Sequence, residues 1–331
     1  MNPLPPVLVM GAGAWGTALA IVATRAGHPV YLWGRDSALI SAMTTSRENP
    51  RYLSGITLPR LLHPITDLTT LPPEVTTAII ATPLQATRAT VALAGHHGIT
   101  AFGCAAKGIE LDSLLLVHEV VLSVAGAASP VAILSGPNFA REVAEGRPAA
   151  LTVAARDANF GRLIVGYLHG PGFRPYVTDD LVGVAVGGAV KNVLAIAAGI
   201  ADGLGLGANS RAALITRGLA EIARLGMALG GRMETFMGLS GLGDLVLTCT
   251  DDQSRNRRFG LALGHGQAVR KAERDIGLVE GIATAAAVIA RASSVGVEMP
   301  IAAQVARTLG GECTPAAAVH ALMTRELGAE S

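Results

Sequence analysis

A glycine-rich turn near the N-terminus, between two apolar segments, most strongly limits how this chain can fold. Gly11, Gly13 and Gly16 form the pattern G-x-G-x-x-G directly after the apolar run at 7–10. An alanine-rich stretch and a second apolar run at 30–33 follow, so the order predicts strand, turn, helix and strand. In that context the pattern is typical of dinucleotide binding, because the glycines let a pyrophosphate approach the backbone at a helix N-terminus. The alternative is a glycine-rich turn without a ligand.

The end of the second predicted strand indicates which dinucleotide would bind. An acidic residue at this place accepts a hydrogen bond from the 2′-hydroxyl of NAD, whereas an arginine pairs with the 2′-phosphate of NADP. The chain has Arg35 followed by Asp36. We therefore expect NADP or NAD as cofactor, with NADP favoured, unless Arg35 is only a solvated loop charge. The expected cofactor contacts of this region are Gly11, Gly13, Ala14, Trp15, Gly16 and Arg35.

Strand and helix patterns alternate through the first half of the chain. Segments 75–87 and 130–146 each predict a strand, a turn and a helix, and strands are predicted within 99–110 and 148–156. This alternation predicts an α/β fold with a Rossmann-type, doubly wound, mostly parallel sheet. Ligands bind at the carboxyl ends of the strands in such sheets. The residues predicted at such ends are Gly11, Pro83, Lys107 and Gly136.

The pattern changes after Asp179, because from there to Ser331 the sequence has helical spacing and little strand signal. Thr178 or Asp179 could cap the N-terminus of the first long helix. We therefore expect a dinucleotide-binding domain at 1–178 and an all-α substrate and catalytic domain at 179–331.

One lysine, Lys191, is the only charged residue in the apolar run 181–201. The run is long enough to span a bilayer, but its four glycines and central charge favour a buried helix of a soluble protein. A buried ammonium group needs a partner, and Asp244, which also stands alone in an apolar, glycine-rich stretch, is the natural one. Such a pair is suited to proton transfer at a carbonyl oxygen. A structural ion pair or a lysine that reaches solvent is the alternative.

The segment 253–260, QSRNRRFG, is the candidate phosphate site. Ser254, Arg255 and Asn256 offer hydroxyl, guanidinium and amide donors in succession, and a helix beginning here would add backbone donors. Asp251 and Asp252 precede the segment and would oppose an anion. The alternative is a solvated basic turn.

Composition excludes other classes of function. With 26 basic and 25 acidic residues the net charge is +1, which provides no electrostatic footprint for nucleic acid. The three cysteines have no metal-ligand spacing and suggest a reducing compartment.

No signal peptide is recognisable at the N-terminus, so a cytoplasmic location is expected. No metal is expected either, since the spacing of the histidines fits no metal site: His63, His96, His97 and His118.

Several motifs then occur in order: GAGAWGTALA, AAKGIE, SGPNFAREVAEG, GGAVKN, GLSGLGDLVLTC and SRNRRFG. Together they resemble the bacterial NAD(P)-dependent glycerol-3-phosphate dehydrogenase family, over nearly the whole chain. The resemblance implies reversible reduction of dihydroxyacetone phosphate to sn-glycerol 3-phosphate, a phospholipid precursor. It also implies a Rossmann-type domain followed by a helical domain, and a homodimer.

The resemblance implies roles for individual residues. Lys191 would be the proton donor in reduction and the acceptor in oxidation, with Asp244 and Lys107 as the other catalytic residues. The implied substrate contacts are Lys107, Gly136, Asn138, Lys191, Asn192, Asp244, Thr248, Ser254, Arg255 and Asn256. The implied cofactor contacts beyond the glycine-rich turn are Pro83, Lys107, Ala140, Arg255, Leu278 and Glu280. Asn138 departs from the serine or threonine that family members often have there.

Two other classes stay open at this point. A β-hydroxyacid dehydrogenase or ketopantoate reductase would also use a lysine on a helix, but would not require Ser254, Arg255 and Asn256. A non-catalytic NAD(P)-binding sensor would not require Lys191 and Asp244 in apolar surroundings.

Overall fold

The computed structural model of the chain describes residues 4–324, which form two compact units. The first unit contains the chain up to Glu110 together with Leu115–Ala185, and the second contains Leu111–Leu114 together with the chain from Val186 onward. The first unit is α/β and the second is helical.

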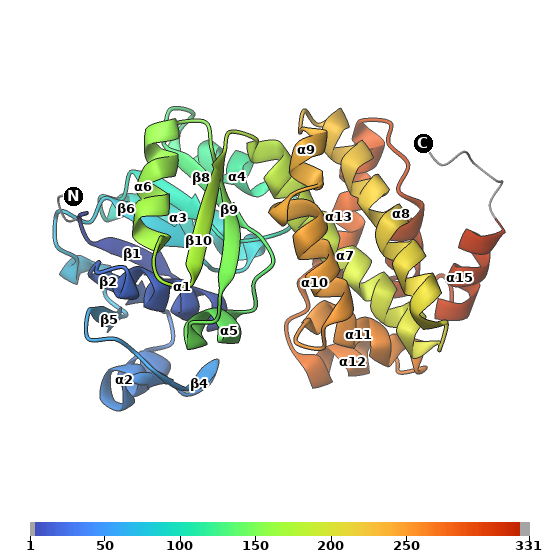
Figure 1. The fold of residues 1–331 in the computed structure, drawn as a ribbon, viewed down its shortest axis with the longest axis horizontal. Helices are drawn as coiled ribbons and strands as arrows, with labels where there is room; N and C mark the ends of the chain where they lie inside the picture. Colours follow the sequence, from blue (N-terminus) through green and yellow to red (C-terminus); the bar gives the residue numbers. More distant parts are fainter. Residues whose placement is uncertain (1–3, 325–331) are drawn as a thin grey trace. The chain divides into compact units, whose positions relative to one another are not determined.

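The first unit is built around an eight-stranded sheet of β1 (Val7–Met10), β2 (Val30–Trp33), β5 (Leu62–Ile65), β6 (Thr77–Ile80), β7 (Ala101–Cys104), β8 (Val131–Ser135), β9 (Ala149–Ala155) and β10 (Phe173–Thr178). The strand order is β10-β9-β8-β7-β6-β1-β2-β5, and all neighbours are parallel except β8 and β9. The strands β1, β6, β7 and β8 are buried at every residue, because a sheet covered on both faces buries both sides of its central strands. The predicted Rossmann-type, mostly parallel sheet is confirmed (Figure 1).

The connections of this sheet explain why it is covered on both faces. Its helices are α1 (Ala14–Arg25), α2 (Ser37–Ser46), α3 (Leu84–His96), α4 (Val117–Ala125), α5 (Ala140–Glu145) and α6 (Ala158–Leu168), with a 3₁₀ turn, η1 (Leu68–Thr70). From β1 the chain crosses through α1 to β2, whereas from β6 it crosses through α3 to β7 in the opposite direction across the sheet. Right-handed crossovers in opposite directions lie on opposite faces. Between α2 and β5, β3 (Glu48–Asn49) and β4 (Leu53–Thr57) form a separate antiparallel pair.

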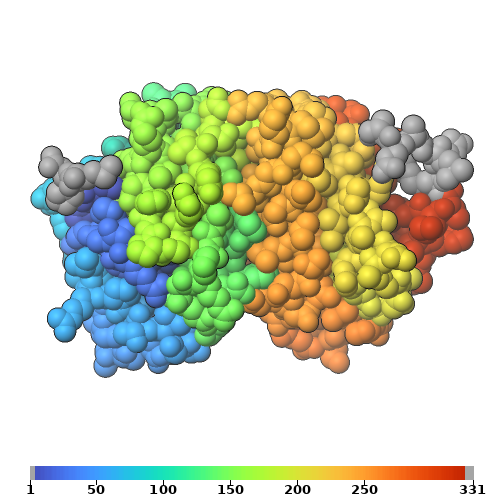
Figure 2. All heavy atoms as spheres, in the orientation of Figure 1, coloured from blue at the N-terminus to red at the C-terminus, as the bar shows by residue number. Residues whose placement is uncertain are grey.

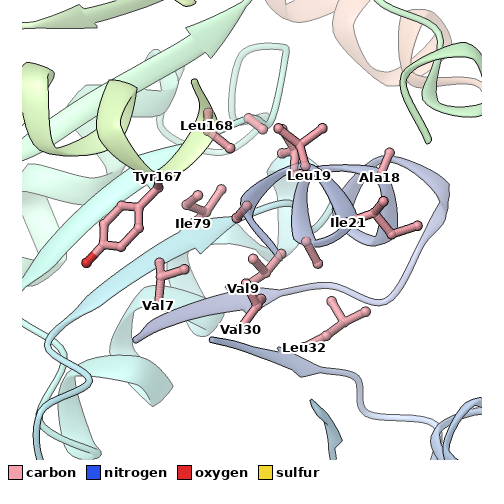
Figure 3. Close-up of a cluster of buried hydrophobic side chains, with 14 of the residues drawn as sticks. Val7, Val9, Ala18, Leu19, Ile21, Val30, Leu32, Ile79, Tyr167 and Leu168 are labelled. Carbon is pink, nitrogen blue, oxygen red and sulfur yellow. The ribbon is translucent and has the colours of Figure 1, made fainter. Parts of the chain in front are cut away.

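One core cluster of the first unit lies between the sheet and the helices α1 and α6. Figure 3 shows Leu19 and Ile21 of α1, Leu168 of α6, and Val9 and Ile79 of the strands within one cluster. All five side chains are fully buried. Burying an aliphatic side chain of this size contributes roughly 1.5–3 kcal/mol, so this cluster holds the glycine-rich turn between β1 and α1 on a rigid base.

The second unit consists of helices: α7 (Leu181–Gly203), α8 (Gly207–Ala228), α9 (Met233–Phe236), α10 (Asp244–Thr250), α11 (Arg255–Gly264), α12 (Val269–Ile276), α13 (Glu280–Ser294), α14 (Pro300–Leu309) and α15 (Pro315–Met323). A π-helical turn, η2 (Leu239–Gly243), leads directly into α10. No strand occurs between residues 181 and 324, in agreement with the sequence pattern. Figure 2 shows α8 in yellow beside the orange helices that include α10 at the surface of this unit, and α8 contacts α10.

Helix α7 is the core helix of the second unit. Among residues 4–324 it alone is long and apolar enough to cross a membrane, but 94% of its most apolar window, with a mean hydropathy of 1.9, is buried inside the protein. Glycines allow α7 and α11 to pack closely. A Cβ at Gly199 of α7 would lie 2.0 Å from the Arg257 carbonyl oxygen of α11, and a Cβ at Gly260 of α11 would lie 2.0 Å from the Ile196 carbonyl oxygen of α7. The backbones of α7 and α11 therefore touch, which only glycine permits.

The start of α7 corrects one expectation. The residue seen to cap the helix is Asp180, whose Oδ1 accepts a hydrogen bond of 2.8 Å from the Gly183 N–H. Because the helix begins at Leu181, the residue directly before it is the one whose side chain reaches the free N–H groups of the first turn. The predicted domain boundary, between residues 178 and 179, lies just before this cap.

Candidate active site

The glycine-rich turn between β1 and α1 fits a bound pyrophosphate. Gly11 has a φ of +119°, and a Cβ at Gly16 would lie 1.9 Å from the Gly11 carbonyl oxygen, so both positions require glycine. At Gly13, in contrast, nothing lies within 4 Å of the place of a Cβ. Gly13 is also the N-cap of α1, with no side chain capping the helix and no acidic residue in its first turn. Ala14 and Trp15 form that turn, whose N–H groups are therefore available to an anion.

Beyond β2, the two candidate ribose contacts differ in their surroundings. Asp36 caps α2, accepting from the Leu39 N–H at 3.0 Å, and pairs with Arg51 at 2.6 Å. The Leu39 N–H and the Arg51 guanidinium hold the pKa of the Asp36 carboxyl below its usual range. Arg35 is exposed and makes no hydrogen bond or ion pair with any residue from 4 to 324.

Three further predicted residues follow strands that run parallel to β1. Pro83, Lys107 and Gly136 come shortly after β6, β7 and β8. These strands and β1 are adjacent and parallel, so their carboxyl ends share one edge of the sheet. A Cβ at Gly136 would lie 2.9 Å from Leu151 Cα, so the turn after β8 requires glycine. The structure thus gathers Gly11, Pro83, Lys107 and Gly136 at the edge where ligands of doubly wound sheets bind.

The orientation of Asn138, just before α5, is defined by one hydrogen bond. Its Nδ2 donates to the Ala150 carbonyl oxygen at 2.9 Å. Its Oδ1 is buried and has no hydrogen-bond partner within the described chain. The amide nitrogen faces the carbonyl, so Oδ1 is left to accept a hydrogen bond from a donor. Ala140, the other predicted contact, is the first residue of α5.

In the second unit, Lys191 and Asp244 form the expected buried ion pair. Lys191 Nζ donates to Asp244 Oδ1 and, at 2.9 Å, to Thr248 Oγ1. The Thr248 hydroxyl in turn donates to the Asp244 carbonyl oxygen at 2.6 Å. The side chains of Lys191 and Asp244 are only 8% and 1% exposed. Burial also raises the pKa of the neighbouring Cys249 thiol to about 12, against the opposing effect of the Lys191 and Arg257 charges.

A chain of amide contacts joins three helices beside this pair. Asn256 of α11 donates to Asn192 Oδ1 at 3.0 Å and accepts from the Gly281 N–H at 2.9 Å. Asn192 of α7 donates to Glu280 Oε2 at 3.3 Å. A Cβ at Gly281 would lie 2.8 Å from Asn256 Oδ1, so this contact also requires glycine. The predicted contacts Asn192, Asn256 and Glu280 therefore form one network.

The phosphate candidates lie at the N-terminus of α11. Ser254 is the N-cap and accepts from the Arg257 N–H at 3.2 Å. Arg255 is exposed and makes no hydrogen bond or ion pair with the described residues, so its planar fork is free to bind an anion. Leu278 is 53% exposed, which contrasts with the buried network around Glu280.

The ion pairs that hold α11 in place were not predicted from the sequence. Arg257 is buried and pairs with Asp252 and, at 2.6 Å, with Asp202 at the end of α7. Asp202 also pairs with Arg211 at 2.9 Å. The charge of Asp252, expected to oppose an anion, is thus partly neutralised by Arg257. The sequence has Arg255, Arg257 and Arg258 close together, and nothing in it indicates that Arg257 is the buried one.

Two residues of the first unit were also missed, Asn49 and Arg51. Asn49 is fully buried against the glycine-rich turn, and Arg51 pairs with Asp36. The only signal was a polar Asn-Pro-Arg-Tyr stretch, which predicts a turn but not its partner.

Reduction of a carbonyl requires a hydride carrier and a proton donor. The first unit has a turn able to bind a dinucleotide, and the second unit has a buried lysine paired with a carboxylate. The fold and the site thus define a two-domain NAD(P)-dependent dehydrogenase. Family models for the N-terminus and the C-terminus of NAD-dependent glycerol-3-phosphate dehydrogenase match residues 6–161 and 180–320. The chain belongs to the NAD-dependent glycerol-3-phosphate dehydrogenase family.

Individual relatives agree over nearly the full length. The chain is 48% identical to a glycerol-3-phosphate dehydrogenase (NAD(P)+) of Xanthomonas campestris pv. campestris, covering 98% of this chain and 96% of that protein. It is 52% identical to one of Nitrosococcus oceani, covering 96% and 94%. The crystal structure of the glycerol-3-phosphate dehydrogenase of Coxiella burnetii is 43% identical, with a TM-score of 0.93 and coverage of 98% and 100%.

These relatives decide between the classes left open by the sequence. A D-mandelate dehydrogenase solved with NADH shares only the fold, at 12% identity and a TM-score of 0.62. Family membership therefore excludes the hydroxyacid and ketopantoate alternatives as the family of this chain.

Proposed function

We propose that this chain catalyses the reversible NAD(P)-dependent reduction of dihydroxyacetone phosphate to sn-glycerol 3-phosphate. The observation that carries the proposal is the buried ion pair of Lys191 with Asp244, in a chain of this family. A phosphorylated triose is the substrate class, and a cationic group at its carbonyl oxygen is what the chemistry requires.

Lys191 is the proposed proton donor in reduction. When bound, the reduced nicotinamide supplies the hydride. Lys191 Nζ then protonates the carbonyl oxygen as negative charge develops there, and it accepts that proton back in the oxidation. Asp244 keeps the ammonium charged in a buried site, and Thr248 fixes the direction of Nζ through its own bond to the Asp244 backbone. We further assign a substrate contact to Lys107 from the motif AAKGIE.

The substrate phosphate is assigned to the N-terminus of α11. An anion would find three kinds of donor here: the Arg255 guanidinium, which has no partner within 4–324, the Ser254 hydroxyl and the first N–H groups of the helix. The Asn256 amide donates one of its two N–H groups to Asn192, and we assign the other N–H to the phosphate. Gly136 and Asn138 are further proposed substrate contacts, with Asn138 Oδ1 accepting from a hydroxyl or amide donor.

NADP is the proposed preferred cofactor. Both oxygens of Asp36 already accept hydrogen bonds, one from Leu39 and one from Arg51, whereas the Arg35 guanidinium has no protein partner among the described residues. A guanidinium without a partner favours a 2′-phosphate over a 2′-hydroxyl. Ala14, Trp15, Pro83, Ala140, Leu278 and Glu280 complete the proposed cofactor contacts.

We also propose a cytoplasmic homodimer whose product enters glycerophospholipid synthesis. The three cysteines, all free, agree with a reducing compartment. The near balance of charge agrees with a small-molecule substrate rather than nucleic acid.

The proposal is tested by following the loss of NADPH absorbance with three substrates. Dihydroxyacetone phosphate should be reduced, and ketopantoate and short β-keto acids should not. Reduction of a keto acid in preference to the phosphorylated triose would contradict the substrate assignment.

A further inference from the structure

A buried asparagine outside the glycine motif holds the glycine-rich turn from behind. Asn49, in β3, is fully buried, although it lies 37 residues from the turn in sequence. Its Nδ2 donates to the Ala12 carbonyl oxygen at 3.0 Å and to Thr17 Oγ1 at 2.9 Å. Both amide hydrogens are therefore used, one on the turn and one on the first helical residues of α1.

The position of Ala12 makes this contact relevant to the cofactor. Ala12 lies between Gly11, where the turn is tightest, and Gly13, which caps α1 without a side chain. A peptide whose carbonyl is fixed on one side cannot rotate, so the following N–H groups keep their direction toward the open side of the turn. Ala12 is flanked by two glycines, and glycine has the largest range of allowed φ and ψ values. The backbone of the turn is therefore not rigid by itself.

The same side chain also orders the segment that contacts Asp36. Asn49 Oδ1 accepts from the Tyr52 N–H at 3.1 Å, which closes the turn that contains Arg51. Arg51 then pairs with Asp36 at 2.6 Å. One amide is thus bonded both to the pyrophosphate turn and to the segment beside the ribose position.

We propose that Asn49 is a positioning residue for dinucleotide binding, which fixes the glycine-rich turn in its binding geometry before the cofactor arrives. The proposal rests on the cofactor part of the proposed function and is independent of the substrate. Only an amide has the required set of two donors and an acceptor at this size: aspartate lacks the donors and leucine lacks both. A buried carbonyl left without its donor would also move toward another partner, which changes the turn.

The test measures binding without turnover. In Asn49→Leu, the equilibrium Kd for NADPH and the Kd for NADH, both from cofactor fluorescence, should each rise at least ~10-fold, because the pyrophosphate is common to them. Hydrogen exchange of the 12–16 amides in the cofactor-free protein should accelerate. The KM for dihydroxyacetone phosphate at saturating cofactor should stay within about twofold of wild type, since the substrate site is not altered.

Two control variants separate positioning from general stability. Thr17→Val removes one partner of Asn49 but keeps the Ala12 contact, so cofactor affinity should be nearly unchanged. Ile164→Val removes one buried methylene of the same unit and should lower stability without changing Kd. If Asn49→Leu does not fold, Asn49→Ala, which removes the amide without adding bulk or charge, should give the same faster exchange and weaker binding.

Three results would overturn the proposal: a Kd within twofold of wild type in the folded Asn49 variant, unchanged exchange of the turn, or an equal loss of affinity in Ile164→Val. Failure of the wild-type protein to bind either dinucleotide would instead reject the cofactor assignment itself, so the two failures are distinguishable.

Discussion

The ammonium nitrogen of Lys191 lies 2.9 Å from the hydroxyl oxygen of Thr248, and that hydroxyl is bonded to the backbone of Asp244. Thr248 and Asp244 are one helical turn apart on α10, so a single short helix presents both partners of the lysine. This arrangement leaves the lysine charged, buried and fixed in direction, as a proton donor at a developing alkoxide must be.

Lys191→Met should abolish turnover while the fold and cofactor binding survive. Methionine keeps the length and apolar volume but holds no proton, so loss of acid catalysis and charge stabilisation should lower kcat by a factor of at least ~10³. The measurement is kcat together with the Kd for NADPH. A variant that keeps a tenth of the wild-type kcat would remove Lys191 from the mechanism.

Arg35→Asp should shift the preference from NADPH toward NADH. The new carboxylate would repel a 2′-phosphate and could accept from a 2′-hydroxyl. The quantity to compare is the ratio of kcat/KM for the two cofactors in both proteins. An unchanged ratio would mean that Arg35 is only a solvated charge.

Arg255→Ala should weaken the use of the phosphorylated substrate by about 2–5 kcal/mol, or about 30-fold to several-thousand-fold in kcat/KM. Unphosphorylated dihydroxyacetone, a poor substrate at best, should lose much less, because it has no phosphate for the guanidinium. Any role of Arg255 in cofactor binding lowers both rates alike, so the difference between substrates carries the information. Equal losses would reject the phosphate assignment.

Asp202→Asn should destabilise the protein by about 1.5–3 kcal/mol, because it removes one charge partner of the buried Arg257 and leaves Asp252 as the other. The same change at Asp252, which is 78% exposed in its side chain, should cost much less. Denaturant unfolding of both variants measures the difference. Equal stabilities of the two variants would show that the buried pair is not what anchors α11.

The buried thiols should resist alkylation and make the protein sensitive to alkali. Burial raises the pKa of Cys104 and Cys249 from 9.0 to about 12, whereas Cys313 is partly exposed. In native protein near neutral pH, mass spectrometry should therefore find Cys313 alkylated first, since the thiolate is the reactive form.

Between pH 9.0 and about 12 only the unfolded chain loses the thiol protons of Cys104 and Cys249, so the free energy of unfolding should fall as pH rises through that window. Equal alkylation of all three cysteines in the native state would contradict this account.

Local patterns in the sequence were enough to predict an α/β unit followed by a helical unit, and to predict the buried ion pair of Lys191 with Asp244. Strand, turn and helix depend on neighbouring residues, so the glycine motif and the alternating pattern predicted the Rossmann-type unit. Lys191 and Asp244 were both recognisable because each is a lone charge in apolar surroundings, and a buried charge needs a partner. The cap of α7 was misjudged because capping depends on the exact first residue of a helix, which periodicity does not define.

Only the tertiary structure decided which polar side chains are used inside the protein. Asn49 meets Ala12 across 37 residues, and Asn256 meets Asn192 across 64. Neither asparagine differs in sequence from one in a solvated turn, because an amide hydrogen-bonds equally well to water. Its partner is selected when packing of the sheet and of the glycine-lined helices excludes that water and leaves one carbonyl, hydroxyl or amide within reach.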